Sequence, residues 1–199
     1  MDVLGSLVSS VVQVVIFSAV PFVWWAVTER GRVPFFKWVG LKRPALADKQ
    51  RAALVIGAAV VFSVSMQFVI PHLVETDDTA VSAFVGRGMA AFVPALLFAF
   101  ISTGLSEEIL FRGFLGKRLV AQHGFVIGNI VQAFVFGLIH GILFWGKTGT
   151  LVSALIAVVT GFTGWLMGYV NERIADGSIV PSWMIHGISN MLSALFVMF

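Results

Sequence analysis

The feature that most constrains the fold of this chain is a series of apolar stretches, each about long enough to cross a bilayer. The first, Val3 to Val27, has no charged residue over 25 positions, and a helix needs about 20 apolar residues to span the hydrocarbon core. Charged residues make up only 12% of the chain and the mean hydropathy is +0.96, whereas about a quarter of the residues of a soluble domain are charged. The sequence therefore predicts an integral membrane protein.

The apolar stretches predict about six transmembrane helices. They are Val3 to Val27, Ala52 to Pro71, about 90 to 118, Phe125 to Trp145, Leu151 to Val170 and Val180 to Phe199. A short helix at the membrane surface is expected around 79 to 88. The first stretch is longer than the core of a signal peptide, so we expect it to be retained. The predicted fold is an all-α, polytopic helix bundle that forms a single domain over residues 1–199.

Basic residues concentrate between the first two predicted spans. Seven of the thirteen Lys and Arg lie there: Arg30, Arg32, Lys37, Lys42, Arg43, Lys49 and Arg51. Cytoplasmic loops carry such an excess, so we expect this loop inside the cell and both termini outside. Glu75, Asp77 and Asp78 in the next loop suit the outer side. Aromatic and cationic residues are mixed from Val33 to Arg43, which is typical of a cytoplasmic segment lying in the headgroup region.

Composition excludes several classes of function. The chain has no cysteine, which removes disulfides, thiolate metal ligands and cysteine nucleophiles. The net charge of +3 comes from loops that set topology, so nucleic acid is not an expected partner. No internal repeat is visible, which disfavours a duplicated transporter fold. Three glycine pairs at helical spacing predict close helix packing: Gly124 and Gly128, Gly137 and Gly141, Gly164 and Gly168.

Two adjacent carboxylates and an arginine lie inside the third predicted span. A charged group at the centre of a membrane helix costs about 2.5–3.5 kcal/mol and is a functional candidate by default. Glu108 and Arg112 stand four apart with the acid first, a favourable helical pair, although Arg112 could instead extend toward the headgroups. Glu107 points about 100° away, where no cation is expected. A desolvated carboxylate suits a general base, so Glu107 is the candidate base and Glu108 the structural partner.

Two later helices carry further polar pairs at a spacing of four, which places both members on one helix face. They are Phe136 with His140, and His186 with Asn190. Counted along the helices, His140 comes out deeper than Glu107, so whether the two meet stays open. A lone His or Asn in a membrane helix can also simply hydrogen-bond a neighbouring helix.

Three motifs now stand in order: Glu107-Glu108-Ile-Leu-Phe-Arg112, Phe136-Gly-Leu-Ile-His140 and His186-Gly-Ile-Ser-Asn190. Together they resemble the CPBP family of intramembrane proteases, which includes the type II CAAX prenyl endopeptidases and the bacterial Abi proteins. The resemblance covers about residues 90–199, which would form the catalytic core. It implies hydrolysis of a peptide bond in a membrane-associated peptide or protein.

The resemblance also implies roles for the site residues. Glu107 with His140 would position and deprotonate a water, and His186 with Asn190 would donate hydrogen bonds to the oxyanion. Glu108, Arg112 and Phe136 would be supporting residues.

A metal-independent mechanism is expected, with no cofactor. Zinc held by Glu107, His140 and His186 is the alternative, since one Glu and two His can bind zinc with an open position. No His-Glu-x-x-His helix occurs in the chain.

Two other functions stay open at this point. One is a non-catalytic bacteriocin-immunity or chaperone-like membrane protein with the same fold. The other is a transporter that uses the acidic pair as a proton or cation site. The four site residues favour the protease, because a pure binder need not retain them all. The short loops suggest a prokaryotic cell membrane.

Overall fold

The computed structural model describes residues 2–69 and 79–199, and within these ranges the chain is helical and contains no β-strand. The α-helices are α1 (Val3–Thr28), α2 (Phe35–Trp38), α3 (Lys49–Val69), α4 (Phe92–Leu97), α5 (Lys117–Tyr169) and α6 (Val180–Met198). Three π-helical segments are η5 (Phe98–Leu105), η6 (Glu108–Gly116) and η7 (Val170–Ile174), and two 3₁₀ turns are η3 (Ser82–Phe84) and η4 (Gly88–Ala91). The predicted all-α class is confirmed.

Among the described residues, three stretches are long and apolar enough to cross a membrane: Val3–Thr28, Lys49–Gln67 and Gly88–Ile174. The third has 87 residues and bends where Gly124 and Gly149 take left-handed φ values of 76° and 77°. Most large side chains of α1 are exposed, and Val27 reaches 81%. A continuous apolar surface of this kind is stable in lipid and not in water. The chain is therefore a membrane protein, while the count of six spans stays a prediction.

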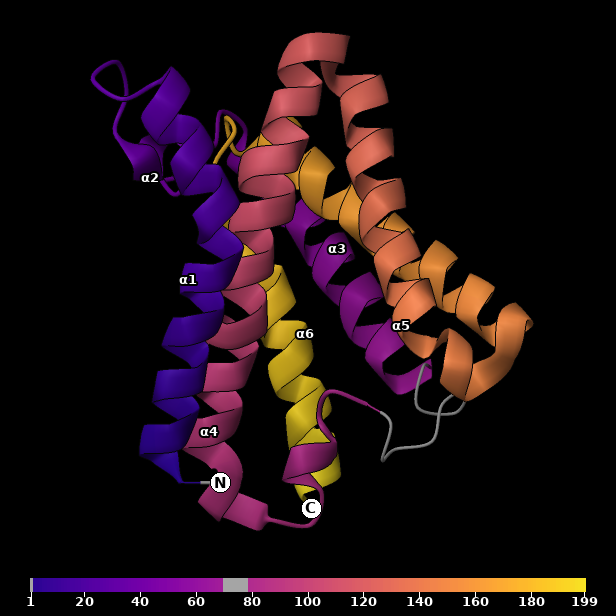
Figure 1. Cartoon of the computed structure of the whole chain (residues 1–199). Coiled ribbons are helices and arrows are strands. Elements are labelled where there is room, and N and C mark those ends of the chain that lie inside the picture. Colours follow the sequence, from indigo (N-terminus) through magenta and orange to yellow (C-terminus); the bar gives the residue numbers. More distant parts are fainter. Residues whose placement is uncertain (1, 70–78) are drawn as a thin grey trace.

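The long helical path passes along the molecule several times (Figure 1). It rises through α4, η5 and η6 between α1 and α6, turns over at Gly124, descends in the first part of α5 and returns after Gly149. Helix α3 packs against α6, and the two marked termini lie at the same end of the bundle (Figure 1). The residues that face one another between α3, η5, α5 and α6 are held away from water.

Some predicted boundaries are wrong. Helix α3 begins at Lys49 and not at Ala52, because Asp48 Oδ1 accepts hydrogen bonds from the backbone N–H groups of Gln50 and Arg51, each at 3.0 Å. The short helix expected around 79 to 88 is replaced by the turns η3 and η4. The predicted positions Pro71, Glu75, Asp77 and Asp78 lie outside the described residues.

The glycines of the predicted pairs differ in whether they lie at a close contact between helices. Gly137 and Gly141 pack as predicted, since a Cβ added at Gly141 would lie 2.9 Å from the carbonyl oxygen of Ser153 and one at Gly137 would lie 2.8 Å from Gly161. Gly124 instead ends a helix with its positive φ and has no atom within 4 Å of an added Cβ, so the prediction of packing there is wrong. The Gly137 contact presses the helix that carries His140 against the returning half of α5.

The basic loop after α1 is anchored to the start of α6. Gly40 accepts a hydrogen bond from the backbone N–H of Ile179 at 2.9 Å, and Lys117 Nζ donates to the Gly177 carbonyl at 2.6 Å. Lys117 also pairs with Glu172 at 2.8 Å. Gly40 has a φ of +84° and a Cβ there would lie 2.6 Å from Lys117 Cε. This junction fixes the position of α6 along the bundle and therefore the level at which its side chains lie.

Candidate active site

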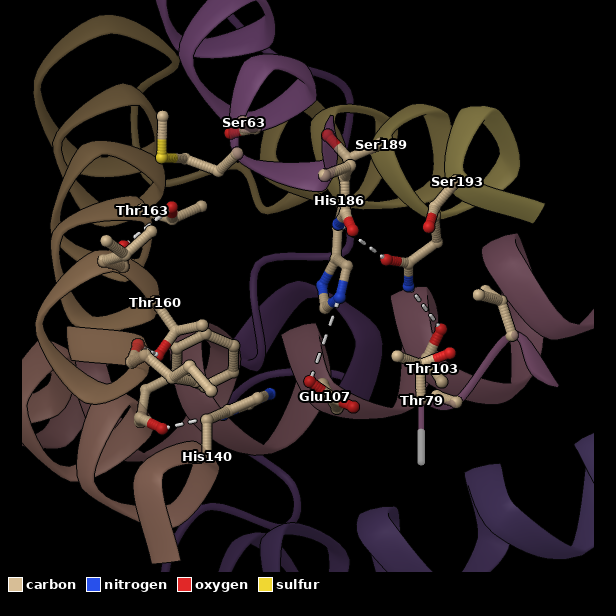
Figure 2. A pocket seen from close by; sticks show the side chains of 18 of the residues that line it. Ser63, Thr79, Thr103, Glu107, His140, Thr160, Thr163, His186, Ser189 and Ser193 are labelled. Atoms are coloured by element: carbon tan, nitrogen blue, oxygen red, sulfur yellow. Dashed lines mark hydrogen bonds and ion pairs between the residues drawn. The ribbon is translucent and has the colours of Figure 1, made fainter. Parts of the chain in front are cut away.

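A cavity of about 240 Å³ opens between α3, η5, α5 and α6 (Figure 2). The motif residues that line it are Glu107, Phe136, His140, His186 and Asn190. The structure therefore brings together side chains from three separate segments of the chain. It also places His140 in the same cavity as Glu107, which the helix counts from the sequence left open.

Glu108 lies in a buried network behind the cavity, with 0% of its surface exposed. Its Oε1 pairs with Arg112 at 3.1 Å, as the spacing of four predicts. Ser182 Oγ donates to its Oε2 at 2.5 Å, and His186 Nδ1 lies 3.1 Å from its Oε1. The guanidinium of Arg112 lies over the Phe136 ring at 4.0 Å and is 3% exposed. Arg112 is thus held inside the bundle, and the alternative of extension to the headgroups is wrong.

Glu107 has the opposite surroundings. Its Oε2 is buried and has no hydrogen-bond partner among the described residues. The nearest cationic candidate, His186 Nε2, lies 3.9 Å away (Figure 2), which is beyond hydrogen-bond distance. Glu107 follows η5 and directly precedes η6, and π-helical turns occur frequently at functional sites. Its free lone pairs face the cavity, where they can accept a hydrogen bond from a bound molecule.

His140 is oriented by its own helix. Its Nδ1 lies 2.8 Å from the carbonyl oxygen of Phe136, and since a carbonyl only accepts, Nδ1 carries the proton. In the neutral ring Nε2 is then the free acceptor. Figure 2 shows the ring extending across the cavity toward Glu107. Two hydrogen-bond acceptors, on Glu107 and His140, therefore face one space.

Asn190 is fixed by neighbours from two other helices. Its Nδ2 donates to Thr103 Oγ1 at 2.8 Å, and its Oδ1 accepts from Gln67 Nε2 at 3.5 Å. The hydroxyl of Thr103 donates a hydrogen bond to the Phe98 carbonyl at 3.0 Å. The orientation of the amide is thus determined, and one of its two N–H groups stays available to the cavity.

The three motifs do not include the residues that hold these side chains in place. Ser182 stands four residues before His186, so the same spacing rule could have found it. Asn171 donates to Ser182 Oγ at 2.8 Å. Neither Asn171 nor Gln67 has a signal in the sequence, because each reaches the site from a different helix.

The three residues considered for zinc line the same cavity, but no group of three His, Asp or Glu side chains that could hold a metal ion occurs in residues 2–69 and 79–199.

The fold and the cavity define a class: a helical membrane protein that gathers acidic and histidine side chains in a cavity among its helices. Residues 89–192, more than half of the chain, match the family model of type II CAAX prenyl endopeptidase Rce1-like proteins. The chain belongs to this family of proteases, which confirms the resemblance. No curated protein and no solved structure matches the chain.

Proposed function

We propose that this protein is an intramembrane endopeptidase in which Glu107 and His140 activate a water molecule. The observation that carries the proposal is the buried Oε2 of Glu107, which accepts no hydrogen bond within the described residues and lies in a cavity that His140 also lines. A buried carboxylate without a partner costs free energy. Such a group is retained where its basicity is used.

A water in this cavity donates one hydrogen to Glu107 and the other to Nε2 of His140. Its oxygen lone pair then attacks the scissile carbonyl carbon while Glu107 takes the proton. The tetrahedral intermediate collapses when Glu107 returns this proton to the leaving nitrogen, and the C–N bond breaks. The products are an amine and a carboxylic acid, which carries the second hydrogen of the water until it releases this proton to solvent.

His186 and Asn190 stabilise the oxyanion in this scheme. Glu108 holds His186 through Nδ1, so an imidazolium at this position directs its Nε2–H into the cavity. The remaining N–H of Asn190 is the second donor. Preorganised donors act strongly because they need no reorientation as charge develops, and removing one costs about 10²- to 10³-fold in kcat.

The experiment that tests the proposal uses the purified protein in detergent with fluorogenic peptides and identifies the new termini by mass spectrometry. Wild-type protein is expected to cleave, and His140→Ala and His186→Ala should each lower kcat by at least about 100-fold. A folded wild-type protein that binds peptides without cleaving them would favour the immunity or chaperone-like function instead.

Zinc dependence is tested with the same assay. Protein washed with a chelator, with its residual zinc measured by mass spectrometry, should retain its full rate. A rate that falls in proportion to zinc and returns on adding it would support the zinc mechanism.

A further inference from the structure

The cavity has two chemically different walls. On the α5 side, Ile156, Val159 and Met167 present apolar groups. The two threonines on this wall donate hydrogen bonds to backbone carbonyls of their own helix. Thr160 donates to Ile156 at 2.6 Å, and Thr163 donates to Val159 at 3.0 Å. This wall therefore offers no free donor and suits an apolar side chain.

The opposite wall is polar. Its polar residues on α6 are His186, Ser189, Asn190 and Ser193, and the apolar residues Phe196 and Val197 line the cavity at the end of this helix. These follow the spacing i, i+3, i+4 and i+7, which places them on one face of the helix. Ser63 and Gln67 of α3 line the same cavity. The polar stripe thus extends from the oxyanion donors along two packed helices.

Two hydroxyls of this stripe have no partner of their own. Ser63 is 4% exposed and Ser189 is 3% exposed, and neither Oγ makes a hydrogen bond within the described residues. Figure 2 shows both at the α3 and α6 side of the cavity, with Ser189 one turn beyond His186. Buried polar groups are almost always hydrogen-bonded. Two unpartnered hydroxyls in one cavity therefore indicate a ligand with polar groups at that wall.

We infer that Ser63 and Ser189 bind the main chain of an extended, apolar substrate segment, whose side chains rest against the α5 wall. The inference rests on the proposed function. A peptide that enters the bundle leaves water, so its backbone N–H and C=O groups need partners. A serine hydroxyl supplies one donor and two acceptors, and it can therefore serve either group. The chemistry it recognises is the peptide backbone, independent of sequence.

The test measures binding without cleavage. The Glu107→Gln protein in detergent is titrated with a fluorescent peptide of twelve alternating alanine and leucine residues, and binding is followed by anisotropy. In this background Ser63→Ala and Ser189→Ala should each weaken binding by about three- to tenfold, the effect of one net hydrogen bond. Ser65→Ala is the matched control, because Ser65 lies on the exposed side of α3, and it should leave binding unchanged.

A second arm identifies the backbone as the ligand. Peptides with single amide-to-ester replacements remove one N–H and weaken one carbonyl acceptor at a time. At one position the ester should weaken peptide binding to the parent protein. The same ester should cause no further loss of affinity in the Ser189→Ala variant, because both changes remove the same hydrogen bond. In cleavage assays of the wild-type background, Ser189→Ala should raise KM and leave kcat within about twofold, a split that a folding defect would not give.

Two results would overturn the inference. One is serine variants that bind the peptide as tightly as their parent, which would mean that the hydroxyls hold only water. The other is absence of saturable peptide binding to the folded parent. A wild-type protein that binds in this pattern but never cleaves would contradict the proposed function alone.

Discussion

Glu107 and Glu108 are neighbours in the chain, and both lie near His186, but their hydrogen bonding differs. Glu108 is surrounded by Arg112, His186 and Ser182, while Glu107 Oε2 accepts no hydrogen bond within the described residues and lies 3.9 Å from His186 Nε2. The partners of Glu108 offset the free-energy cost of burying its charge. Glu107 has no such compensation, so the desolvation cost of its charge remains. One carboxylate therefore holds the site together, and the other is free for chemistry.

Arg112→Ala should destabilise the fold because it leaves the fully buried Glu108 carboxylate without its cation. Breaking a buried pair in this way costs about 3–5 kcal/mol. We expect a lower yield of folded protein and a lower melting temperature in detergent, with activity per folded molecule reduced less than in His186→Ala.

The double variant Glu108→Gln with Arg112→Met is the matched control, because it removes both charges and keeps the volume. Replacing both members of a buried pair is often neutral, so its melting temperature should lie above that of Arg112→Ala. A double variant that melts lower than the single one would contradict the role of the ion pair.

At the scale of helices, the spacing of residues within one helix predicted which side chains share a face. Contacts between different helices could not be predicted from the sequence. The Glu108 and Arg112 pair and the shared face of His186 and Asn190 follow from helix geometry alone. The contact between Gln67 and Asn190 depends on how α3 rotates and crosses α6, which no local pattern encodes. The π-helical segments around Glu107 were also missed, since they shift the register of a helix without a turn residue to mark them.

Gly40→Ala should disturb the junction that anchors α6. Its φ of +84° is costly for alanine, and the added Cβ would also collide with the Gly177 carbonyl and Lys117 Cε. Gly31→Ala is the matched control, with a φ of +90° and no atom within 4 Å of an added Cβ.

Both variants carry the strain of a positive φ, so the difference between their unfolding midpoints measures the steric contact of the added Cβ at position 40 with Gly177 and Lys117. We expect Gly40→Ala to be at least about 1 kcal/mol less stable than Gly31→Ala and to have lower activity, because α6 carries His186. Equal stability of the two variants would contradict the anchoring role.

At the scale of the whole molecule, the two ends of the bundle differ in charge. The loop from 30 to 51 holds seven of the thirteen basic residues and lies at the end opposite to the two termini (Figure 1). By the positive-inside rule we propose that this end faces the cytoplasm. The proposed topology therefore has both termini outside and an even number of crossings.

Because the chain has no cysteine, single cysteines report this topology directly. With a membrane-impermeant maleimide on intact cells, Phe199→Cys should be labelled and Arg32→Cys should be labelled only after permeabilisation. Both positions are exposed in the structure. Labelling of Arg32→Cys in intact cells would reverse the orientation.

The central claim is that Glu107 activates the attacking water, and single-turnover cleavage by Glu107→Gln tests it most directly. Glutamine keeps the shape and removes the base, so the account predicts a rate about 10²- to 10⁴-fold below wild type. Peptide affinity and melting temperature should stay at or above the wild-type values, since an unpartnered buried charge is removed. A Glu107→Gln protein that cleaves within about threefold of the wild-type rate would contradict the account.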